Sequence, residues 1–384
     1  MITLVTNVSQ LVTPEGRGAL FGAGMSVVSV FESVEILIED GRITAIGPEG
    51  SVRPSGDVET LDAGGRIVLP GLVDPHRHLG FVPPRSSTRD EPADRARVES
   101  RLQRGIRRAS RHGVTRIEVK CGRDLAGAAE VDGLDLVQRL DGVPPVRIVP
   151  TLLAEVSEAD APQRDDRISE LISEVIPTVR RLRIAGFCDV VCGPGGCSPA
   201  EAETILRAAR GAGLTPKVHL VGSETATGAH LGERLGAASV DHLISCTTRA
   251  SAALRRSGVI GVLLPGNSFV AGKPYPDARR MIEDGLALAL GTDYGFQEHG
   301  VESPWVALSF AVARAGMTLE EGIVACTLNA AAALEMADEA GSVELGKAGD
   351  LAILETEDYR EIATSIGANP VWRTVIGGKV VDPS

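Results

Sequence analysis

The sequence lacks several features that would assign it to a specialised class of protein. No apolar run reaches the length of about 18 residues that spans a bilayer. The N-terminus shows no basic stretch followed by an apolar run, as a secretory signal would. The six cysteines show no paired spacing that would predict a disulfide framework. We therefore expect a cytoplasmic protein that does not bind a membrane.

Positive charge is also scarce. The formal net charge is −12, with 39 lysines and arginines against 51 aspartates and glutamates. Nucleic acids and anionic membrane surfaces both select basic patches, so neither is an expected partner. With 384 residues, 43% of them hydrophobic, the chain is long enough for one large globular domain and an appended smaller one.

The two ends of the chain share a pattern of short strands. Residues 33–39 and 42–46 are strand-like around Asp40-Gly41, a turn signal typical of hairpins. Near the C-terminus, residues 351–354 and 375–381 are similar. The pattern predicts that both ends contribute to one small β-sandwich, which we assign to residues 1–66 plus 340–384.

Between the ends, residues 67–339 alternate apolar strands with helical stretches, which predicts βα units around a parallel sheet. Eight units over this length favour a (β/α)₈ TIM-type barrel as the catalytic domain. A doubly wound open sheet is the alternative, but no Gly-x-Gly-x-x-Gly opens a helix after the first strand. The expected strands are 67–73, 114–119, 146–153, 187–191, 214–218, 238–241, 259–264 and 286–290, with helical periodicity at 95–112, 168–185, 199–213 and 277–285.

Polar residues cluster where these strands end, which is where a barrel carries its catalytic groups. His76 and His78 follow the first strand, and residues two apart in an extended segment point the same way. His219 ends the fifth strand, His242 the sixth and Asp293 the eighth. Imidazoles with a carboxylate, and one position left open for water, are the usual composition of a catalytic divalent metal site.

Over about residues 30–355, the sequence resembles the amidohydrolase superfamily and, within it, the imidazolonepropionase family. The metal motifs are highly specific for the superfamily. The resemblance implies that His76, His78, His219 and Asp293 bind one Zn²⁺ or Fe²⁺, with His242 beside the metal-bound water. The matching segments are 69–79 (LPGLVDPHRHL), 112–120 (HGVTRIEVK), 217–219 (KVH), 235–243 (LGAASVDHL), 263–266 (LLPG) and 289–293 (ALGTD).

A single metal ion is expected. Binuclear members of the superfamily bridge their ions with a carboxylated lysine or a glutamate at the end of strand 4, and residues 188–192 offer neither. Lys120 ends strand 2, where the family also carries a lysine that is no bridge. Nitrogen and oxygen ligands of this kind also accept Mn²⁺.

The expected chemistry follows from charge. A divalent ion lowers the pKa of bound water towards about 7. Asp293 can then take a proton from that water and pass it to the leaving nitrogen. His242 can polarise the carbonyl oxygen on which negative charge develops.

The substrate pocket departs from the family pattern. Arg85 stands at the spacing of the family's carboxylate-binding arginine, but a tyrosine position holds Arg123 and a histidine position holds Val156. The acidic run after the strand-5 histidine becomes Leu220-Val-Gly, and Gly295 replaces an asparagine. Lost hydrogen-bond partners reduce selectivity for a polar ring. We therefore expect Arg85, Arg123, Val156 and Leu220 to bind an aromatic or apolar carboxylated substrate rather than imidazolonepropionate.

Three functions stay open on the sequence alone. The first is hydrolysis of a C–N bond in a small cyclic amide, lactam or imine. The second is ring closure at the same metal site, since benzoxazole-forming enzymes of natural-product pathways resemble this pattern. The third is a non-catalytic scaffold, which retention of every ligand and of His242 disfavours. The expected assembly is a homodimer, because cyclic dimers are the commonest oligomers.

Overall fold

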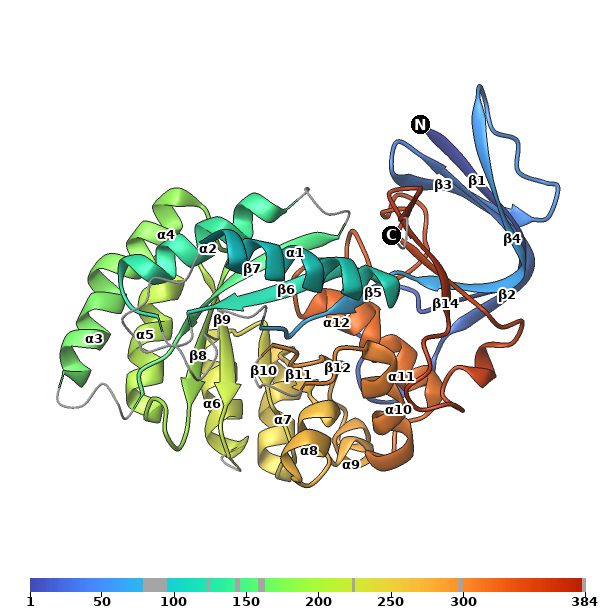
Figure 1. Ribbon diagram of the computed structural model, residues 1–384. Helices are drawn as coiled ribbons and strands as arrows, with labels where there is room; N and C mark the ends of the chain where they lie inside the picture. Colours follow the sequence, from blue (N-terminus) through green and yellow to red (C-terminus); the bar gives the residue numbers. More distant parts are fainter. Residues whose placement is uncertain are drawn as a thin grey trace.

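The computed structural model describes residues 1–78, 95–122, 125–141, 146–157, 163–222, 225–295 and 300–381. Arg85 and Arg123 therefore lie outside the described residues. The chain forms two β-sheets, a parallel one surrounded by helices and a smaller one that holds both termini (Figure 1). No helix in the described ranges is both long and apolar enough to cross a membrane.

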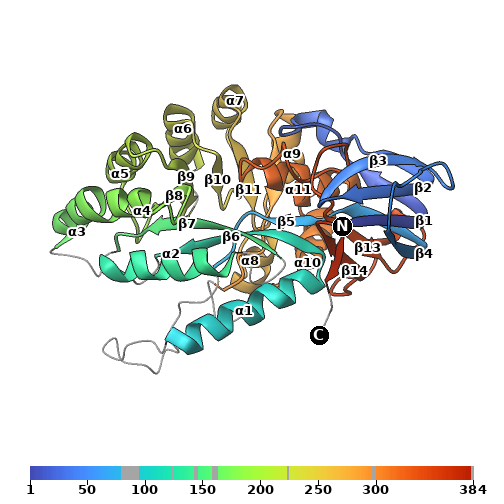
Figure 2. The same ribbon diagram turned by 90° about the horizontal axis from the view of Figure 1, so that it is seen from above.

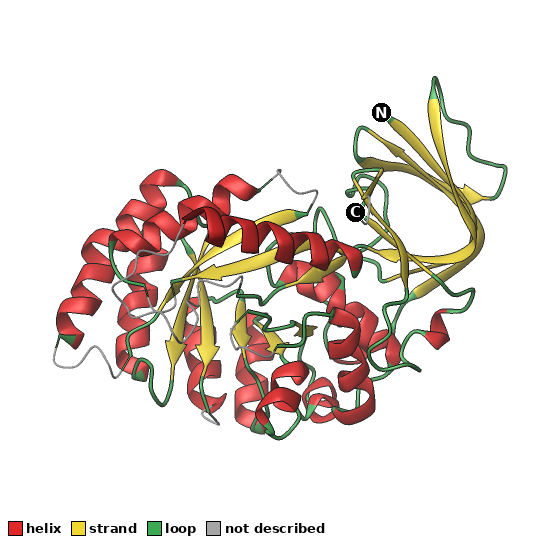
Figure 3. Cartoon of the chain, in the orientation of Figure 1, coloured by secondary structure: helices red, strands yellow, loops and turns green. Residues whose placement is uncertain are grey.

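The smaller sheet combines the two ends of the chain, which confirms the predicted β unit. It has seven strands in the order β15-β14-β13-β4-β1-β2-β3, and it curves strongly (Figure 3). β1 pairs with β4 in parallel, and the other neighbours are antiparallel. Asp40 and Gly41 both have positive φ, as the predicted hairpin turn requires. The strands are β1 Ile2–Thr13, β2 Ser29–Glu39, β3 Arg42–Pro48, β4 Val58–Pro70, β13 Leu351–Leu354, β14 Val371–Ile376 and β15 Lys379–Val381.

The larger sheet has eight parallel strands in chain order from β5 to β12. It is the predicted (β/α)₈ barrel. Seven of the eight strands lie within two residues of their predicted positions. They are β5 Leu72–Asp74, β6 Val114–Cys121, β7 Arg147–Ala154, β8 Phe187–Cys192, β9 Thr215–Leu220, β10 Ser239–Asp241, β11 Ile260–Leu263 and β12 Leu288–Leu290.

The first barrel strand is the exception, and its predicted start was wrong. Residues Ile67–Pro70 belong to β4 and pair with β13 in the smaller sheet, and only Leu72–Asp74 enter the barrel. Every residue from 67 to 74 is buried or half-buried, so hydrophobicity could not reveal the change of sheet at Gly71. We retain the division into a composite β unit and a catalytic barrel as a proposal, with its first junction moved to Gly71.

The helices surround the parallel strands (Figure 2). The chain also has short 3-10 helices, η1 Gly22–Ser26 and η4 Tyr359–Glu361. A π-helical turn, η3 Leu171–Val175, joins α3 to α4. The α-helices are α1 Arg95–Arg111, α2 Ala128–Leu140, α3 Arg164–Glu170, α4 Ile176–Leu182, α5 Pro199–Gly211, α6 Thr225–Leu235, α7 Thr248–Ser257, α8 Pro265–Ala271, α9 Ala278–Glu283, α10 Pro304–Arg314, α11 Leu319–Cys326 and α12 Leu328–Ala332.

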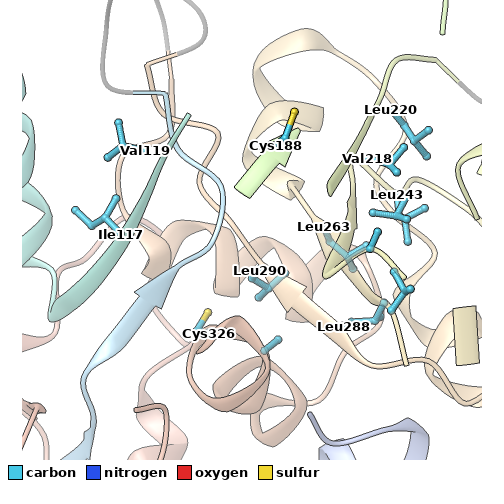
Figure 4. Close-up of a cluster of buried hydrophobic side chains, with 14 of the residues drawn as sticks. Ile117, Val119, Cys188, Val218, Leu220, Leu243, Leu263, Leu288, Leu290 and Cys326 are labelled. Atoms are coloured by element: carbon cyan, nitrogen blue, oxygen red, sulfur yellow. The ribbon is translucent and has the colours of Figure 1, made fainter. Parts of the chain in front are cut away.

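The barrel strands are apolar on the face towards the helices. Ile117 and Val119 on β6, and Val218 and Leu220 on β9, belong to the main hydrophobic core (Figure 4). Because successive side chains of a strand point to opposite faces, the residues between them point into the barrel. Those inward residues are polar.

The two edge strands of the barrel meet just beyond β5 and β12. Asp293 N donates to His76 O at 3.0 Å, and His78 N donates to Tyr294 O at 2.7 Å. This close approach depends on Gly291, where a Cβ would lie 2.8 Å from His76 Cβ. The barrel is thus drawn together at the residues that the sequence identified as metal ligands.

We predict that Gly291→Ala destabilises the fold by about 1–3 kcal/mol, the usual cost of overpacking a tight core. The control is Gly186→Ala, which also changes a glycine near a barrel strand but has no heavy atom within 4 Å of the added Cβ. Chemical denaturation would compare the two midpoints. Equal stability of both variants would contradict this account of how the barrel edges meet.

Candidate metal centre

Three imidazoles converge at the C-terminal ends of the barrel strands. His76 and His78 follow β5, and His219 lies near the end of β9. His76 Nε2 and His78 Nε2 are 3.3 Å apart, and one ring nitrogen from each of the three histidines lies within 4.8 Å of the others. All three side chains are almost completely buried, so their ring nitrogens are shielded from bulk water.

Asp293 brings a carboxylate to the same point. Its Oδ1 lies 3.5 Å from the Nε2 atoms of both His76 and His78. Its other oxygen, Oδ2, accepts a hydrogen bond from the side-chain amide of Asn267 on α8. Asn267 thereby leaves Oδ1 as the oxygen that faces the imidazoles.

His242 lies at the outer side of this group. Its Nε2 is 4.0 Å from Asp293 Oδ1, and its ring centroid is 4.3 Å from that of His219. It exposes 17% of its side chain, against 2% for Asp293, which places it towards solvent. Within the described part of the chain, Nε2 has no hydrogen-bond partner. His242 therefore lies on the solvent side of the three more deeply buried imidazoles.

The backbone is strained at both of these residues. His242 has φ +64° and Asp293 has φ +55°, in the left-handed region that non-glycine residues seldom adopt. Each such conformation costs on the order of 1–3 kcal/mol and persists where the surroundings enforce it. Strain at the ends of two barrel strands, β10 and β12, is typical of a functional site.

Two of the imidazoles favour the neutral form, which is the form that binds metal. Burial lowers the pKa of His76 well below its ordinary value, and the Lys120 ammonium adds to this effect. Burial, with His219 beside it, also lowers the pKa of His242 well below its ordinary value. His76 Nδ1 lies 2.6 Å from Asp241 Oδ2, so a proton on Nδ1 leaves the Nε2 lone pair available to an ion.

A buried group of charged residues lies behind the imidazoles, and the sequence reasoning missed it. The ammonium nitrogen of Lys120 lies 2.7 Å from Asp189 Oδ2 and 3.0 Å from Asp241 Oδ2. Glu118 Oε2 lies 3.2 Å from Lys120 Nζ and 2.8 Å from Lys217 Nζ. The signal was available, because polar residues alternate with apolar ones along these buried strands.

These ion pairs favour the charged form of each partner, so they raise the pKa of Lys120 and lower the pKa values of Asp189 and Asp241. Burial opposes the charge of Lys120, but Asp189, Asp241 and Glu118 raise its pKa well above the ordinary value. Burial likewise opposes ionisation of Asp241, whose pKa Lys120 and Lys217 hold well below the ordinary value. The pKa of Asp189 is lowered for the same reason, again with Lys120 as the main favourable charge. These directions favour the ionised forms of Lys120, Asp189 and Asp241 at neutral pH.

A divalent cation fits this donor set. With the imidazoles neutral, the carboxylates of Glu118, Asp189, Asp241 and Asp293 face only two ammonium groups, which leaves a formal excess of two negative charges. Uncompensated buried charge is costly, and an ion of charge +2 at the imidazoles would balance it. Imidazole and carboxylate are also the ligands that zinc, iron and manganese accept.

A second network supports the segment that carries the His-x-His motif. Arg77, between the two histidines, is completely buried and lies 2.9 Å from Glu302 Oε1 and 3.6 Å from Asp74 Oδ2. Its guanidinium lies over the ring of Tyr294, 4.6 Å from the centroid. Asp74 in turn accepts from Thr292 Oγ1 at 2.6 Å, which couples the ends of β5 and β12.

The structure brings together His76, His78, His219, His242 and Asp293, as the sequence led us to expect. For the substrate pocket the outcome differs. Leu220 was predicted to contact substrate, but it packs outwards against α6, where a Cβ on Gly228 would lie 2.4 Å from its Cδ2. That prediction was wrong, because Leu220 and His219 point to opposite faces of β9. Val156 is fully buried in the main core, and its role stays a prediction.

Comparison with known proteins places this geometry in a family. Residues 191–381 match the amidohydrolase family. The chain is 35% identical to an imidazolonepropionase of Geobacillus kaustophilus (strain HTA426), across 98% of this chain and 97% of the relative. It is 34% identical to an imidazolonepropionase of Solibacter usitatus (strain Ellin6076), across 98% of this chain and 97% of the relative.

Solved structures show the same fold at lower identity. A triazine hydrolase variant superimposes with a TM-score of 0.78 at 17% identity, covering 99% of this chain and 94% of that one. N-isopropylammelide isopropylaminohydrolase from Burkholderia multivorans ATCC 17616 gives 0.73 at 20% identity, covering 99% and 98%. Barrel, β unit and sequence together define an amidohydrolase-superfamily protein. Within the superfamily, this chain belongs to the imidazolonepropionase-like branch.

We predict that Asp241→Ala weakens metal binding by about 10- to 100-fold, the usual effect of removing a carboxylate that orients a ligand imidazole. The variant removes the acceptor 2.6 Å from His76 Nδ1 and leaves every proposed ligand in place. Zn²⁺ affinity, measured by competition with a chromophoric chelator, would test it. An unchanged dissociation constant would show that Asp241 does not orient His76.

Proposed function

We propose that this protein is a metal-dependent hydrolase that opens a C–N bond in a small cyclic amide, lactam or imine. The observation that carries the proposal is the convergence of four nitrogen and oxygen donors with His242 at the C-terminal end of the barrel. A barrel places its catalytic groups at this end. The buried and strained setting of these groups, with its excess of negative charge, goes beyond what a structural scaffold requires.

We infer one divalent ion, Zn²⁺ or Fe²⁺ with Mn²⁺ as the alternative, held by His76, His78, His219 and Asp293. On β8, the Asp189 carboxylate is paired with the Lys120 ammonium, which argues against a bridge to a second ion. When bound, the ion supplies a water of lowered pKa and polarises the carbonyl or imine of the substrate.

The remaining steps fall to residues of this chain. Asp293 accepts the proton of the attacking water, because its carboxylate lies between His76, His78 and His242. It then delivers that proton to the leaving nitrogen. Asn267 holds the second oxygen of Asp293 in place during both transfers. His242, the more exposed of the two groups, hydrogen-bonds the oxygen on which negative charge develops.

The proposed substrate is an aromatic or apolar carboxylated molecule rather than imidazolonepropionate. Arg85 and Arg123 supply the positive charge for its acid group, and Val156 remains a candidate apolar contact. The acidic residue that follows the strand-5 histidine in the family is missing here, where Leu220 faces the core instead. The proposed substrate contacts are taken from the sequence of the pocket and no longer include Leu220.

We predict that His78→Ala abolishes stoichiometric metal binding and all hydrolysis, since it removes one of four ligands. The matched control is His230→Ala, which changes a histidine on α6 whose side chain is 42% exposed and lies outside the metal centre. Metal content of both purified variants would be measured by mass spectrometry. Wild-type protein without metal, or metal content unaffected in His78→Ala, would overturn the assignment.

We predict a kcat/KM on imidazolonepropionate at least about 100-fold below that on the preferred aromatic lactam acid, because unpaired polar groups penalise the wrong substrate heavily. A panel of carboxylated lactams, cyclic imides and imidazolones would be followed by ultraviolet absorbance. A normal specificity constant on imidazolonepropionate would refute the substrate proposal. Formation of a heterocycle from an open hydroxy-amide acid, without hydrolysis of lactams, would assign ring closure instead.

A further inference from the structure

Lys120 lies at the centre of the charged group behind the imidazoles, with no exposed side-chain surface. It lies on β6, the strand next to β5, and its side chain reaches carboxylates on β8 and β10. Its ammonium nitrogen has carboxylate oxygens at 2.7, 3.0 and 3.2 Å, so all three of its protons have acceptors. A lysine with this number of charged partners is fixed in position.

Two of these carboxylates each share one oxygen between Lys120 and an imidazole. Asp241 Oδ2 lies 3.0 Å from Lys120 Nζ and 2.6 Å from His76 Nδ1. Asp189 Oδ2 lies 2.7 Å from Lys120 Nζ and 3.5 Å from His219 Nδ1. The two arms differ in length, because Asp241 hydrogen-bonds His76 whereas Asp189 makes a longer contact with His219, but each ends on the Nδ1 atom of a proposed metal ligand.

The arrangement settles which nitrogen of each ring faces the ion. A carboxylate at Nδ1 keeps the proton there and turns Nε2 to the metal. Without Lys120, the Asp189 and Asp241 carboxylates would share a buried space with no cation between them. Like charges that close together repel, and either carboxylate would turn away or take up a proton.

We propose that Lys120 is a positioning residue that orients His76 and His219 together, by holding the Asp241 and Asp189 carboxylates behind them. This role rests on the proposed metal site. The Lys120 ammonium pairs with Asp189, Asp241 and Glu118, and we assign its effect on the orientation of the imidazoles to the two aspartates. One ammonium group thereby couples ligands that come from opposite sides of the barrel sheet, from the end of β5 and from β9.

The test compares Lys120→Met with Lys347→Met in the full-length protein. Lys347 is equally buried, with its Nζ 3.3 Å from Glu344 Oε2 and 2.6 Å from Ser342 Oγ, but it lies outside the metal centre. Both variants remove a buried ammonium and are expected to lower the melting temperature. Zn²⁺ affinity of the metal-free proteins is expected to fall about 10- to 100-fold in Lys120→Met and less than about 2-fold in Lys347→Met.

A double variant separates positioning from general stability. Lys120→Met with Asp189→Asn removes one positive and one negative charge, so it is expected to recover part of the melting temperature lost in Lys120→Met. Zn²⁺ affinity is expected to stay low, because the carboxylate behind His219 is then absent. If Lys120→Met alone does not fold, Lys120→Gln replaces it in the same comparison.

The outcomes are distinct. Equal Zn²⁺ affinities of Lys120→Met and Lys347→Met would overturn the positioning role and leave the proposed hydrolase intact. Recovery of full affinity in the double variant would also overturn it, because only stability would then have been at stake. A wild-type protein that binds no divalent metal would instead overturn the proposed function itself.

Discussion

Charge buried inside the barrel has to be paired, and this requirement organises the whole catalytic end of the molecule. Five ionised side chains, Glu118, Lys120, Asp189, Lys217 and Asp241, are almost completely removed from solvent. Their desolvation would be prohibitive if any of them lacked a partner. Each therefore lies within 3.2 Å of an opposite charge, and the raised pKa of Lys120 and the lowered pKa of Asp241 reflect that mutual stabilisation.

Pairing of this kind demands positional accuracy from the backbone. The charged residues occupy inward positions on β6, β8, β9 and β10, and the register of neighbouring parallel strands sets their spacing. A slip of one residue would turn every charge into the hydrophobic layer beneath the helices. The apolar outward face, with Ile117, Val119 and Val218, therefore stabilises the register on which the metal centre depends (Figure 4).

Most of the architecture was predictable from the sequence, because apolar strands and helical periodicity repeat eight times in the chain. The ligands were predictable for a related reason: parallel strands present their C-terminal ends at one edge. The start of β5 was not predictable. The run from Ile67 to Val73 belongs to two different sheets, and it is apolar in both. The direction of Leu220 required the strand register, which neighbouring hydrophobicity does not reveal.

The charged residues behind the imidazoles could not be predicted from the sequence for a different reason. Lys120 and Lys217 read individually as surface residues, since lysine is seldom fully buried. Only their alternation with Ile117, Val119 and Val218 shows that they face inwards. Lys120 pairs with Asp189, 69 residues further along the chain, and Lys217 pairs with Glu118, which precedes it on β6. Pairing over such separations is a property of the folded barrel and cannot be derived from local pattern.

The same geometry explains why the metal centre indicates the type of chemistry but not whether a ring is opened or closed. Asp293 between the imidazoles can accept a proton from an attacking water or from an internal hydroxyl of a substrate. In the proposed mechanism His242 stabilises the same oxygen in both cases, because the tetrahedral species is reached from either side. What decides between ring opening and ring closure is therefore which nucleophile occupies the space beside His242. Strand ends fix the position of the proton-transfer groups, whereas residues beyond those ends determine which nucleophile is admitted.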